Sequence, residues 1–205
     1  MNMLPCRLFT VFKLVALLAV SVTGVFAGGL VDTSAERFGN SDFTNSEFIT
    51  NPWWTLTAGE NRIYFAETDD GCAWNMVEVM YTTTSDFEGI YAGTFARVVL
   101  DREWLDEECE YDNFQDVWLN LATDEATYDW YSQDSENNIW YMGEDTLDVE
   151  GSSEGSFIAG CNGAEAGIVI LGNPNKGDFY QQEFYEDEAE DWGKVLNFVE
   201  LNDME

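Results

Sequence analysis

Three acidic residues near clusters of aromatic residues have the right chemistry for catalysis: Glu144, Asp145 and Glu183. Two carboxyl groups about 5 to 9 Å apart hydrolyse a glycosidic bond when one acts as the acid and the other as the nucleophile or base. This chemistry needs no histidine. The chain has 40 Asp and Glu residues, so acids that are adjacent by chance are expected. The three residues therefore predict a carboxylate-dependent glycan hydrolase or lyase only as an alternative function.

The segment 128–145, YDWYSQDSENNIWYMGED, combines large aromatic residues with acids and contains no base. Side chains alternate between the two faces of a strand, so these rings divide between two faces. Rings that pack across strands stabilise a hairpin by roughly 0.2–1 kcal/mol per pair. Rings on an open face instead stack on a sugar or an apolar ligand, while carboxylates and amides bind its hydroxyls. On this second interpretation the ligand-binding residues are Trp130, Tyr131, Trp140, Tyr141, Tyr180 and Gln182, with Glu144, Asp145 and Glu183 at the rim.

The chain has no histidine, which excludes Ser-His-Asp and Cys-His catalysis, histidine bases and imidazole metal sites. Three cysteines, Cys72, Cys109 and Cys161, follow the amino-terminal apolar segment. They contain no CxxC spacing of the kind that binds zinc or takes part in redox exchange. In an oxidising compartment they most simply form one disulfide, and the sequence leaves all three pairings open.

The first 27 residues have the pattern of a secretory signal peptide. Arg7 and Lys13 provide a basic start, residues 14–26 are apolar, and small residues stand where a signal peptidase cuts. The apolar run is shorter than the roughly 20 residues that cross a bilayer, so we expect cleavage and not a retained anchor. The mature chain would begin near Gly28 and be secreted or periplasmic.

The chain is strongly acidic, with 8 Lys and Arg against 40 Asp and Glu and a formal net charge of −32. Loss of the two basic residues of the signal peptide makes this charge more negative still. Such a surface repels nucleic acid and anionic membranes and attracts cations. Aromatic residues make up 15% and hydrophobic residues 45% of the chain, so a folded domain is expected and not a disordered acidic one. Ions must screen the repulsion, which favours a halophilic or marine setting.

The many carboxylates of this chain are compatible with bound calcium as a cofactor. The stretch 134–138, DSENN, looks like the start of an EF-hand loop, but Ile139 and Asp145 replace the glycine at loop position six and the glutamate at position twelve. The flanks are predicted strands, so we reject an EF-hand. Calcium bound by loop carboxylates stays open, against diffuse attraction of cations to the whole surface. The candidate calcium-binding loops are the one that contains Asp69 and Asp70 and the one at residues 186–191.

Beyond residue 50 the pattern is mostly that of β-strands, whereas residues 28–50 are expected to form a partly ordered polar leader. Residues 68–71, TDDG, have the composition of a hairpin turn, and Asn137 suits a left-handed turn position in another hairpin. The best helical candidate is short, residues 186–192. We predict strands over residues 63–66, 73–81, 89–100, 117–121, 129–133, 139–143, 156–159, 168–171, 179–184 and 195–201.

About ten short strands joined by hairpins predict an all-β fold with one domain over residues 51–205. Consecutive hairpins favour an antiparallel meander that forms a barrel or a strongly curled sheet, and a β-sandwich is the alternative.

Several segments form an ordered signature over residues 49–192. NP at residues 51–52 is followed by DWYSQDSENNIWYMGEDT, GSFIAGCNGAEAGIVI and GDFYQQEFYEDEAED. This series resembles a family of secreted bacterial proteins of unassigned function with the signature Asp-Trp-Tyr-x-Gln-Asp…Asn-x-Trp-Tyr-x-Gly-Glu-Asp. The resemblance implies a secreted β domain and no particular activity. The chain departs from the family pattern at Leu100, Asn137 and Phe157, where arginine, glycine and tryptophan are expected.

The main hypothesis is an exported acidic β domain that binds a small molecule, a glycan or a cation without covalent chemistry. The aromatic-rich meander, the absence of histidine and the cation-attracting surface motivate it. The first alternative is the carboxylate-dependent hydrolase or lyase. The second alternative is a cell-envelope structural or adhesion protein.

Overall fold

The computed structural model describes residues 28–198, so the expected signal peptide at residues 1–27 lies outside the described residues. Most strands of the described chain belong to one antiparallel sheet. They are β3 (Asn61–Thr68), β4 (Gly71–Thr84), β5 (Ala96–Asp106), β6 (Glu125–Gln133), β7 (Ile139–Asp148), β8 (Phe157–Ile158), β9 (Glu165–Ile170) and β11 (Glu183–Phe184). They pair in the order β11, β9, β7, β6, β5, β4 and β3, with β8 joined to β7.

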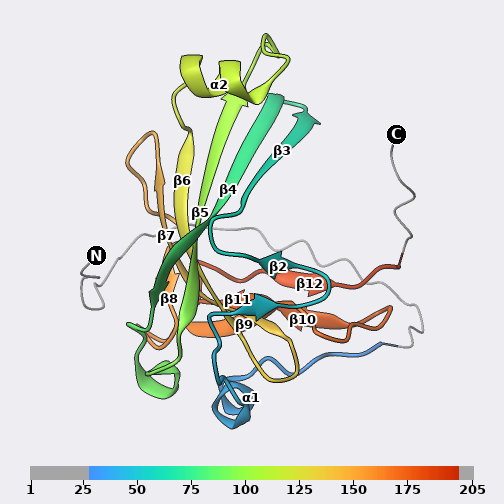
Figure 1. The fold of residues 1–205 in the computed structure, drawn as a ribbon. Helices are drawn as coiled ribbons and strands as arrows, with labels where there is room; N and C mark the ends of the chain where they lie inside the picture. Colours follow the sequence, from blue (N-terminus) through green and yellow to red (C-terminus); the bar gives the residue numbers. More distant parts are fainter. Residues whose placement is uncertain (1–27, 199–205) are drawn as a thin grey trace.

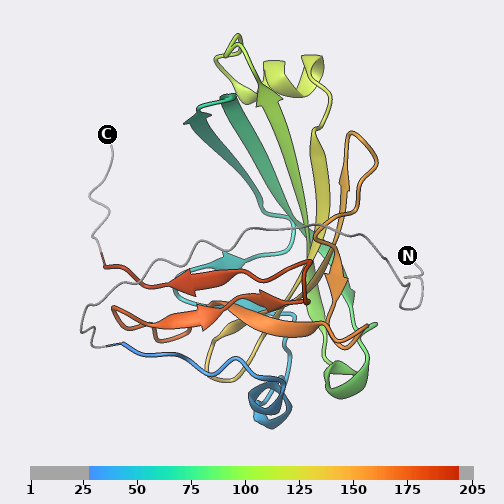
Figure 2. The ribbon, with the colours of Figure 1, turned by 180° about the vertical axis from the view of Figure 1, so that it is seen from behind.

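Strands β3 to β7 follow one another in sequence and in space, which is the antiparallel meander that the sequence predicts. The sheet is strongly curled into a half-barrel, and the short strands β9 and β11 run across the lower ends of the long strands (Figures 1 and 2). Its edge strands β3 and β11 do not pair with each other. The prediction of an all-β fold with a strongly curled sheet is confirmed.

Smaller elements surround the sheet. The strands β1 (Ile49–Thr50) and β2 (Thr55–Leu56) form one two-stranded ribbon, and β10 (Phe179–Gln181) and β12 (Trp192–Lys194) form another. The helix α2 (Phe114–Asn120) lies at the upper end of β4 and β5 in Figure 1, and α1 (Ala35–Asn40) lies at the opposite end of the molecule. A 3-10 helix, η1 (Gly89–Tyr91), precedes β5.

Residues 117–121 were predicted as a strand, and this prediction is wrong because most of them lie in α2. Asn113 caps this helix, since its side-chain oxygen accepts a hydrogen bond from the N–H of Asp116 at 3.1 Å. Val117 is fully buried and packs with Trp74 and Trp104 of the sheet. A run of five mostly apolar residues does not reveal its period, so the cap and the packing decide its structure.

The structure also corrects three segment boundaries. Residues 186–192 form no helix but a turn closed by a β-bridge, and β12 begins at Trp192. Like charges one turn apart repel one another in a helix, which explains why this acidic stretch avoids one. Residues 195–198 form no strand, and residues 199–201 lie outside the described residues. The strand predicted from residue 89 begins only at Ala96.

The largest core cluster lies between α1, η1 and the sheet. It contains Trp130 and Trp140, which are 4% and 0% exposed. The segment 28–50, expected as a polar leader, contributes Phe38, which packs edge-on against Trp140 with ring centroids 5.1 Å apart. Phe43 stacks on Phe38 at 4.2 Å. This segment is therefore packed against the rest of the domain by its aromatic residues.

A disulfide joins Cys72 at the start of β4 to Cys109 in the loop before α2. It is one of the three pairings that the sequence leaves open, and it ties α2 to the sheet that it covers. Among residues 28–198, no helix has the length and apolar character needed to span a membrane.

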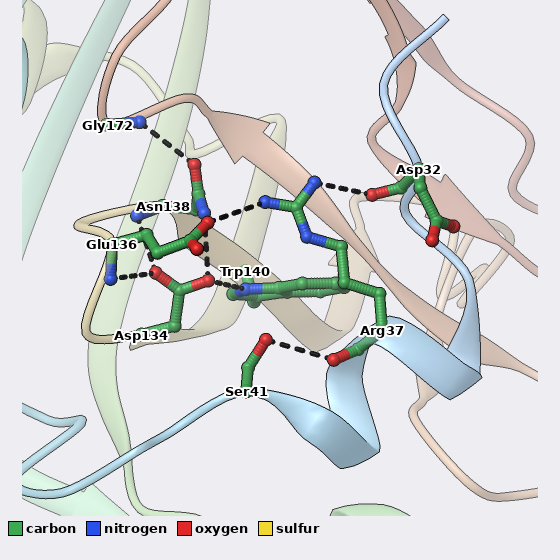
Figure 3. A network of polar contacts seen from close by, with 8 residues as sticks. All are labelled: Asp32, Arg37, Ser41, Asp134, Glu136, Asn138, Trp140 and Gly172. Carbon is green, nitrogen blue, oxygen red and sulfur yellow. Dashed lines mark hydrogen bonds and ion pairs between the residues drawn. The ribbon is translucent and has the colours of Figure 1, made fainter.

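The β6–β7 hairpin is organised by one buried carboxylate, Asp134, which is 3% exposed (Figure 3). Its Oδ1 atom accepts hydrogen bonds from the N–H groups of Glu136 and Asn138, both at 2.9 Å. Its Oδ2 atom accepts from Nδ2 of Asn138 and from Nε1 of Trp140, again at 2.9 Å. Asn137 has φ 64°, the left-handed conformation that its residue type predicts. Asp134 therefore joins the turn to the core.

We expect Asp134→Asn to lower the free energy of unfolding by about 2–4 kcal/mol. An asparagine side chain has one acceptor oxygen and one NH₂ group. Its NH₂ group would face N–H donors from which it cannot accept a hydrogen bond. Urea denaturation measures the change. Glu136→Gln is the matched control, because Glu136 is exposed and its ion pair with Arg37 contributes about 0–1 kcal/mol. Equal effects of the two substitutions would contradict this role of Asp134.

Candidate functional site

Strand β7 contains a bulge opposite β6. Trp130 pairs with Gly143 and Tyr131 pairs with Tyr141, so Met142 is an extra residue without a partner in this register. Met142 is fully buried in the core cluster beside Trp130. A bulge of this kind shifts the alternation of side chains by one residue along the strand.

The bulge brings Tyr141 and Glu144 to the same face of the sheet although they are three residues apart. Gly143 makes it feasible, because its φ is 138° and a Cβ atom there would lie 2.3 Å from the carbonyl oxygen of Phe157. Only glycine fits such a position without displacing the backbone of β8. The sheet face opposite to Trp130 and Met142 thereby receives a tyrosine and a carboxylate side by side.

A cavity of about 290 Å³ opens on that face, across β4, β5, β6 and β7. We call it the acidic cleft, because five of its nine lining residues are acids and none is a base. Its lining residues are Asn75, Asp101, Glu103, Glu125, Thr127, Asp129, Tyr131, Tyr141 and Glu144.

The acids of the cleft lie in rows across the strands. Asp129 pairs with Glu144 in one row, and Glu103 pairs with Glu125 in another. Asp101 lies in the row between them, opposite Thr127. Neighbouring rows are two residues apart along a strand, which is about 7 Å. The carboxyl groups therefore follow the strand direction at regular intervals.

Hydrogen bonds and ring contacts fix the side chains at the end of the cleft that contains Asp129 and Glu144. The Tyr141 hydroxyl donates to Oδ1 of Asp129 at 2.5 Å and lies 3.1 Å from Oε2 of Glu144. The rings of Tyr131 and Tyr141 stack with centroids 5.0 Å apart. Trp54 packs edge-on against Tyr131, also at 5.0 Å. These contacts fix both tyrosine rings against the cavity.

In the next row of the cleft, Nδ2 of Asn75 donates to Oδ1 of Asp101 at 2.5 Å. The Thr146 hydroxyl donates to Oε2 of Glu144 at 3.2 Å. Two groups that line the cleft have no hydrogen-bond partner among residues 28–198: Oδ2 of Asp129 and the hydroxyl of Tyr131. Asp129 is only 5% exposed. Oδ2 of Asp129 is not among the fully buried side-chain atoms of the described residues that lack a partner, so it is accessible from the cleft and free to accept a hydrogen bond from a ligand.

Burial raises the pKa of several acids in and beside the cleft. It raises the pKa of Asp129 well above its usual value, aided by the charges of Glu144, Asp101 and Glu183 and opposed by the hydrogen bond from Tyr141. Burial likewise raises the pKa of Asp101 to about 6. Burial and the charges of Glu144 and Asp191 raise the pKa of Glu183 to about 7. No positively charged Lys or Arg side chain of the described chain is among the causes of these three pKa shifts; the only contribution from such a residue is the backbone N–H of Arg102, which lowers the pKa of Asp101.

The three predicted catalytic residues do not line one cavity together. Glu144 lines the acidic cleft, and burial raises its pKa. Glu183 of β11 influences the pKa of Asp129 and lines a neighbouring cavity of about 340 Å³. Asp145 is exposed on the opposite face of β7, because it follows Glu144 directly. Asp145 is therefore separated from the acid pair with which it was grouped.

The predicted ligand-binding residues divide as well. Tyr131 and Tyr141 line the acidic cleft. Trp130 and Trp140 lie in the core and do not line it, because strand alternation and the bulge turn them away. Two others lie outside the cleft lining: Tyr180 is 7% exposed and belongs to the core, and Gln182 donates a hydrogen bond to the Val169 carbonyl at 3.3 Å.

Sequence reasoning missed most of the lining residues of the cleft. Asp101 and Glu103 stand two apart on β5, and Glu125, Thr127 and Asp129 stand two apart on β6. Polar residues at this period share one face of a strand, which was the available signal. The burial of Thr127 and Asp129 and the partial burial of Asp101 were not readable, since a polar face is usually exposed to solvent.

In residues 28–198, no group of three or more His, Cys, Asp or Glu side chains is placed to hold a metal ion. Comparisons with protein-family models, curated proteins and solved structures find no match. The resemblance in the signature over residues 49–192 therefore stays a prediction.

The raised pKa values predict that stability falls as pH rises. An acid with a raised pKa binds more protons folded than unfolded, so its folded form is favoured at low pH and destabilised as pH rises through its folded pKa. For Asp101 this window runs from 3.8 to about 6, and for Glu183 from 4.5 to about 7. We expect the melting temperature in high salt to fall between pH 5 and pH 8.

Asp129→Asn should raise the free energy of unfolding at pH 8, because it removes a carboxyl group whose burial raises its pKa well above the usual value. The amide oxygen can still accept the hydrogen bond of Tyr141 while the buried charge is removed. Asp145→Asn removes one exposed charge and serves as the control. Denaturation at pH 5 and pH 8 measures both variants, and a pH dependence that Asp129→Asn leaves unchanged would contradict the assignment.

Proposed function

We propose that the protein is an exported binding domain whose acidic cleft takes a small molecule, a glycan or a cation without covalent chemistry. One observation carries this proposal. The cleft combines two stacked tyrosine rings with a buried carboxylate, Asp129, that keeps one oxygen without a partner. Aromatic side chains and polar atoms that lack partners, lining one cavity together, are typical features of a small-molecule site.

The cost of the cleft supports a role in binding. Apolar residues of similar volume are generally as stable as buried charges or more so, and Asp129, Asp101 and Glu144 have no basic partner to offset their full or partial burial. Elsewhere on the same sheet, Glu78 forms an ion pair with Arg102 at 2.9 Å. The fold itself therefore gives no reason to keep the cleft acids, whereas a ligand does.

Export is supported by three features. The disulfide between Cys72 and Cys109 suits an oxidising compartment. The amino-terminal sequence has the pattern of a signal peptide, and the acidic surface suits a salty exterior or periplasm. On this proposal the domain meets its ligand outside the cytoplasm.

A second candidate function is a carboxylate-dependent glycan hydrolase or lyase. The observation that favours it is the pKa of Glu183, about 7, beside that of Glu144, which is also raised. A carboxyl group that stays protonated near neutral pH suits a general acid. Glu144→Gln and Glu183→Gln test this function in an assay of reducing ends released from glycans. Turnover that neither variant reduces would exclude it.

A structural or adhesion protein is favoured by the edge strand β3, where Ile63, Tyr64 and Phe65 are each about half exposed. An edge strand with exposed apolar side chains pairs readily with another chain. Capture of a protein partner that β3 variants abolish, with no ligand in the cleft, would support this function over the binding domain.

The binding domain is tested by a ligand screen with matched variants. Thermal-shift and calorimetric titrations against sugars, amines and Ca²⁺ should find a ligand that raises the melting temperature. Glu144→Gln should weaken its binding at least about tenfold, since a hydrogen bond to a charged group contributes about 1.5–3 kcal/mol. Asp145→Asn, one residue away on the opposite face, should leave affinity within about twofold. Equal losses in both variants would show that the ligand binds elsewhere.

A further inference from the structure

The charge of the acidic cleft selects among the ligand classes. Five carboxyl groups meet there, and no basic residue lines it. A neutral sugar would leave their mutual repulsion unchanged, and an anion would increase it. A cation relieves it directly. The described residues include no group of three acids placed around a single metal ion, so the carboxyls are spread out and not convergent.

The carboxyl groups of the cleft lie at regular intervals along the strands. The row of Asp129 and Glu144, the row of Asp101, and the row of Glu103 and Glu125 succeed one another every two residues. This spacing is about 7 Å, and the outer rows are about 13 Å apart. A single small cation meets one row only. A ligand with cationic groups at intervals meets all three.

Linear amines have this geometry. Five single bonds of about 1.5 Å separate the nitrogens of an extended four-carbon diamine, which places them about 6 Å apart. A further three-carbon unit adds about 5 Å on the same basis. The chain between the nitrogens is apolar, and the stacked rings of Tyr131 and Tyr141 supply an apolar surface at one end of the cleft. Tyrosine faces also attract ammonium groups.

We infer that the acidic cleft binds a linear aliphatic diamine or polyamine, extended along β5, β6 and β7, with its ammonium groups at successive carboxyl rows. This inference rests on the proposed binding function and names its ligand class. One ammonium group bonds to the free Oδ2 of Asp129 and faces the tyrosine rings. The next ones face Asp101 and the pair of Glu103 and Glu125.

Binding should release protons. A bound ammonium group favours the charged form of each carboxyl group near it and so lowers its pKa. Affinity should therefore rise between pH 5 and pH 8, and titrations in buffers of different ionisation enthalpy should report proton release. The titratable groups that face the ligand or one another there are Asp101, Glu103, Glu125, Asp129, Tyr131, Tyr141 and Glu144, with Asp124, Glu183 and Asp191 beside them.

The test is isothermal titration of the mature protein with spermidine at pH 8 in 0.3 M NaCl, where diffuse attraction to the acidic surface is screened. We expect spermidine to bind at least tenfold more tightly than 1-butylamine, which has one nitrogen, and 1,4-butanediol to show no binding. Equal affinities for spermidine and 1-butylamine would overturn the inference, because the periodic rows would then contribute nothing.

Variants separate the cleft from the surface. Asp129→Asn, Asp101→Asn and Glu144→Gln should each weaken spermidine binding at least tenfold, and Asp145→Asn should weaken it less than twofold. Circular dichroism confirms that each variant is folded. A loss in Asp145→Asn as large as that in Glu144→Gln would mean that spermidine condenses on the surface, which overturns the inference.

Amide chemical shifts distinguish failure of the inference from failure of the proposed function. If glucose or Ca²⁺ shifts the amides of Asp129 and Tyr131 while spermidine does not, the ligand class is wrong and the binding function stands. If no amine, sugar or cation shifts them, both proposals fall. Shifts caused by spermidine and confined to the lining residues of the cleft support both.

Discussion

The bulge residue Met142 in β7 determines which side chains of the sheet pack in the core and which line the acidic cleft. Without the bulge at Met142, strand alternation would place Tyr141 and Glu144 on opposite faces, and the Tyr141 hydroxyl could not lie between Asp129 and Glu144. The bulge in turn requires Gly143, because a side chain there would collide with the backbone of β8. A core of tryptophan, methionine and phenylalanine on one face and a cleft of tyrosine and carboxylate on the other both depend on this local change of register.

The same division explains why acids and aromatic residues are crowded together in the segment 128–145. Trp130 and Trp140 supply the core, Asp134 holds the hairpin by accepting four hydrogen bonds, and Tyr131, Tyr141 and Glu144 line the cleft. A basic partner would offset part of the cost of burying an acid, but no base lines the cleft. Their charge is the property that a bound cation would balance, which connects the fold to the proposed ligand.

The sequence predicted the architecture better than the site. Alternation and turn residues such as Asn137 predicted the meander, because they act locally. The helix at residues 114–120 was missed although its cap at Asn113 is a local signal, since the packing of Val117 on Trp104 depends on tertiary contacts. Two tyrosines and Glu144 of the cleft were found from composition. Asp101 and Asp129 were not, because burial, which makes them chemically distinctive, follows from a bulge and a curl that no single strand reveals.

The central claim is that Asp129 is buried, and Asp101 and Glu144 half-buried, in the cleft without a compensating positive charge in the ligand-free protein. Carbon-13 NMR of the side-chain carboxyl groups, followed from pH 3 to pH 9, tests it most directly. The account predicts that Asp129 titrates well above its usual range, that Asp101 titrates near pH 6 and that Glu183 titrates near pH 7. Titration of Asp129, Asp101 and Glu183 at about pH 4, the usual range of Asp and Glu side chains, would contradict it.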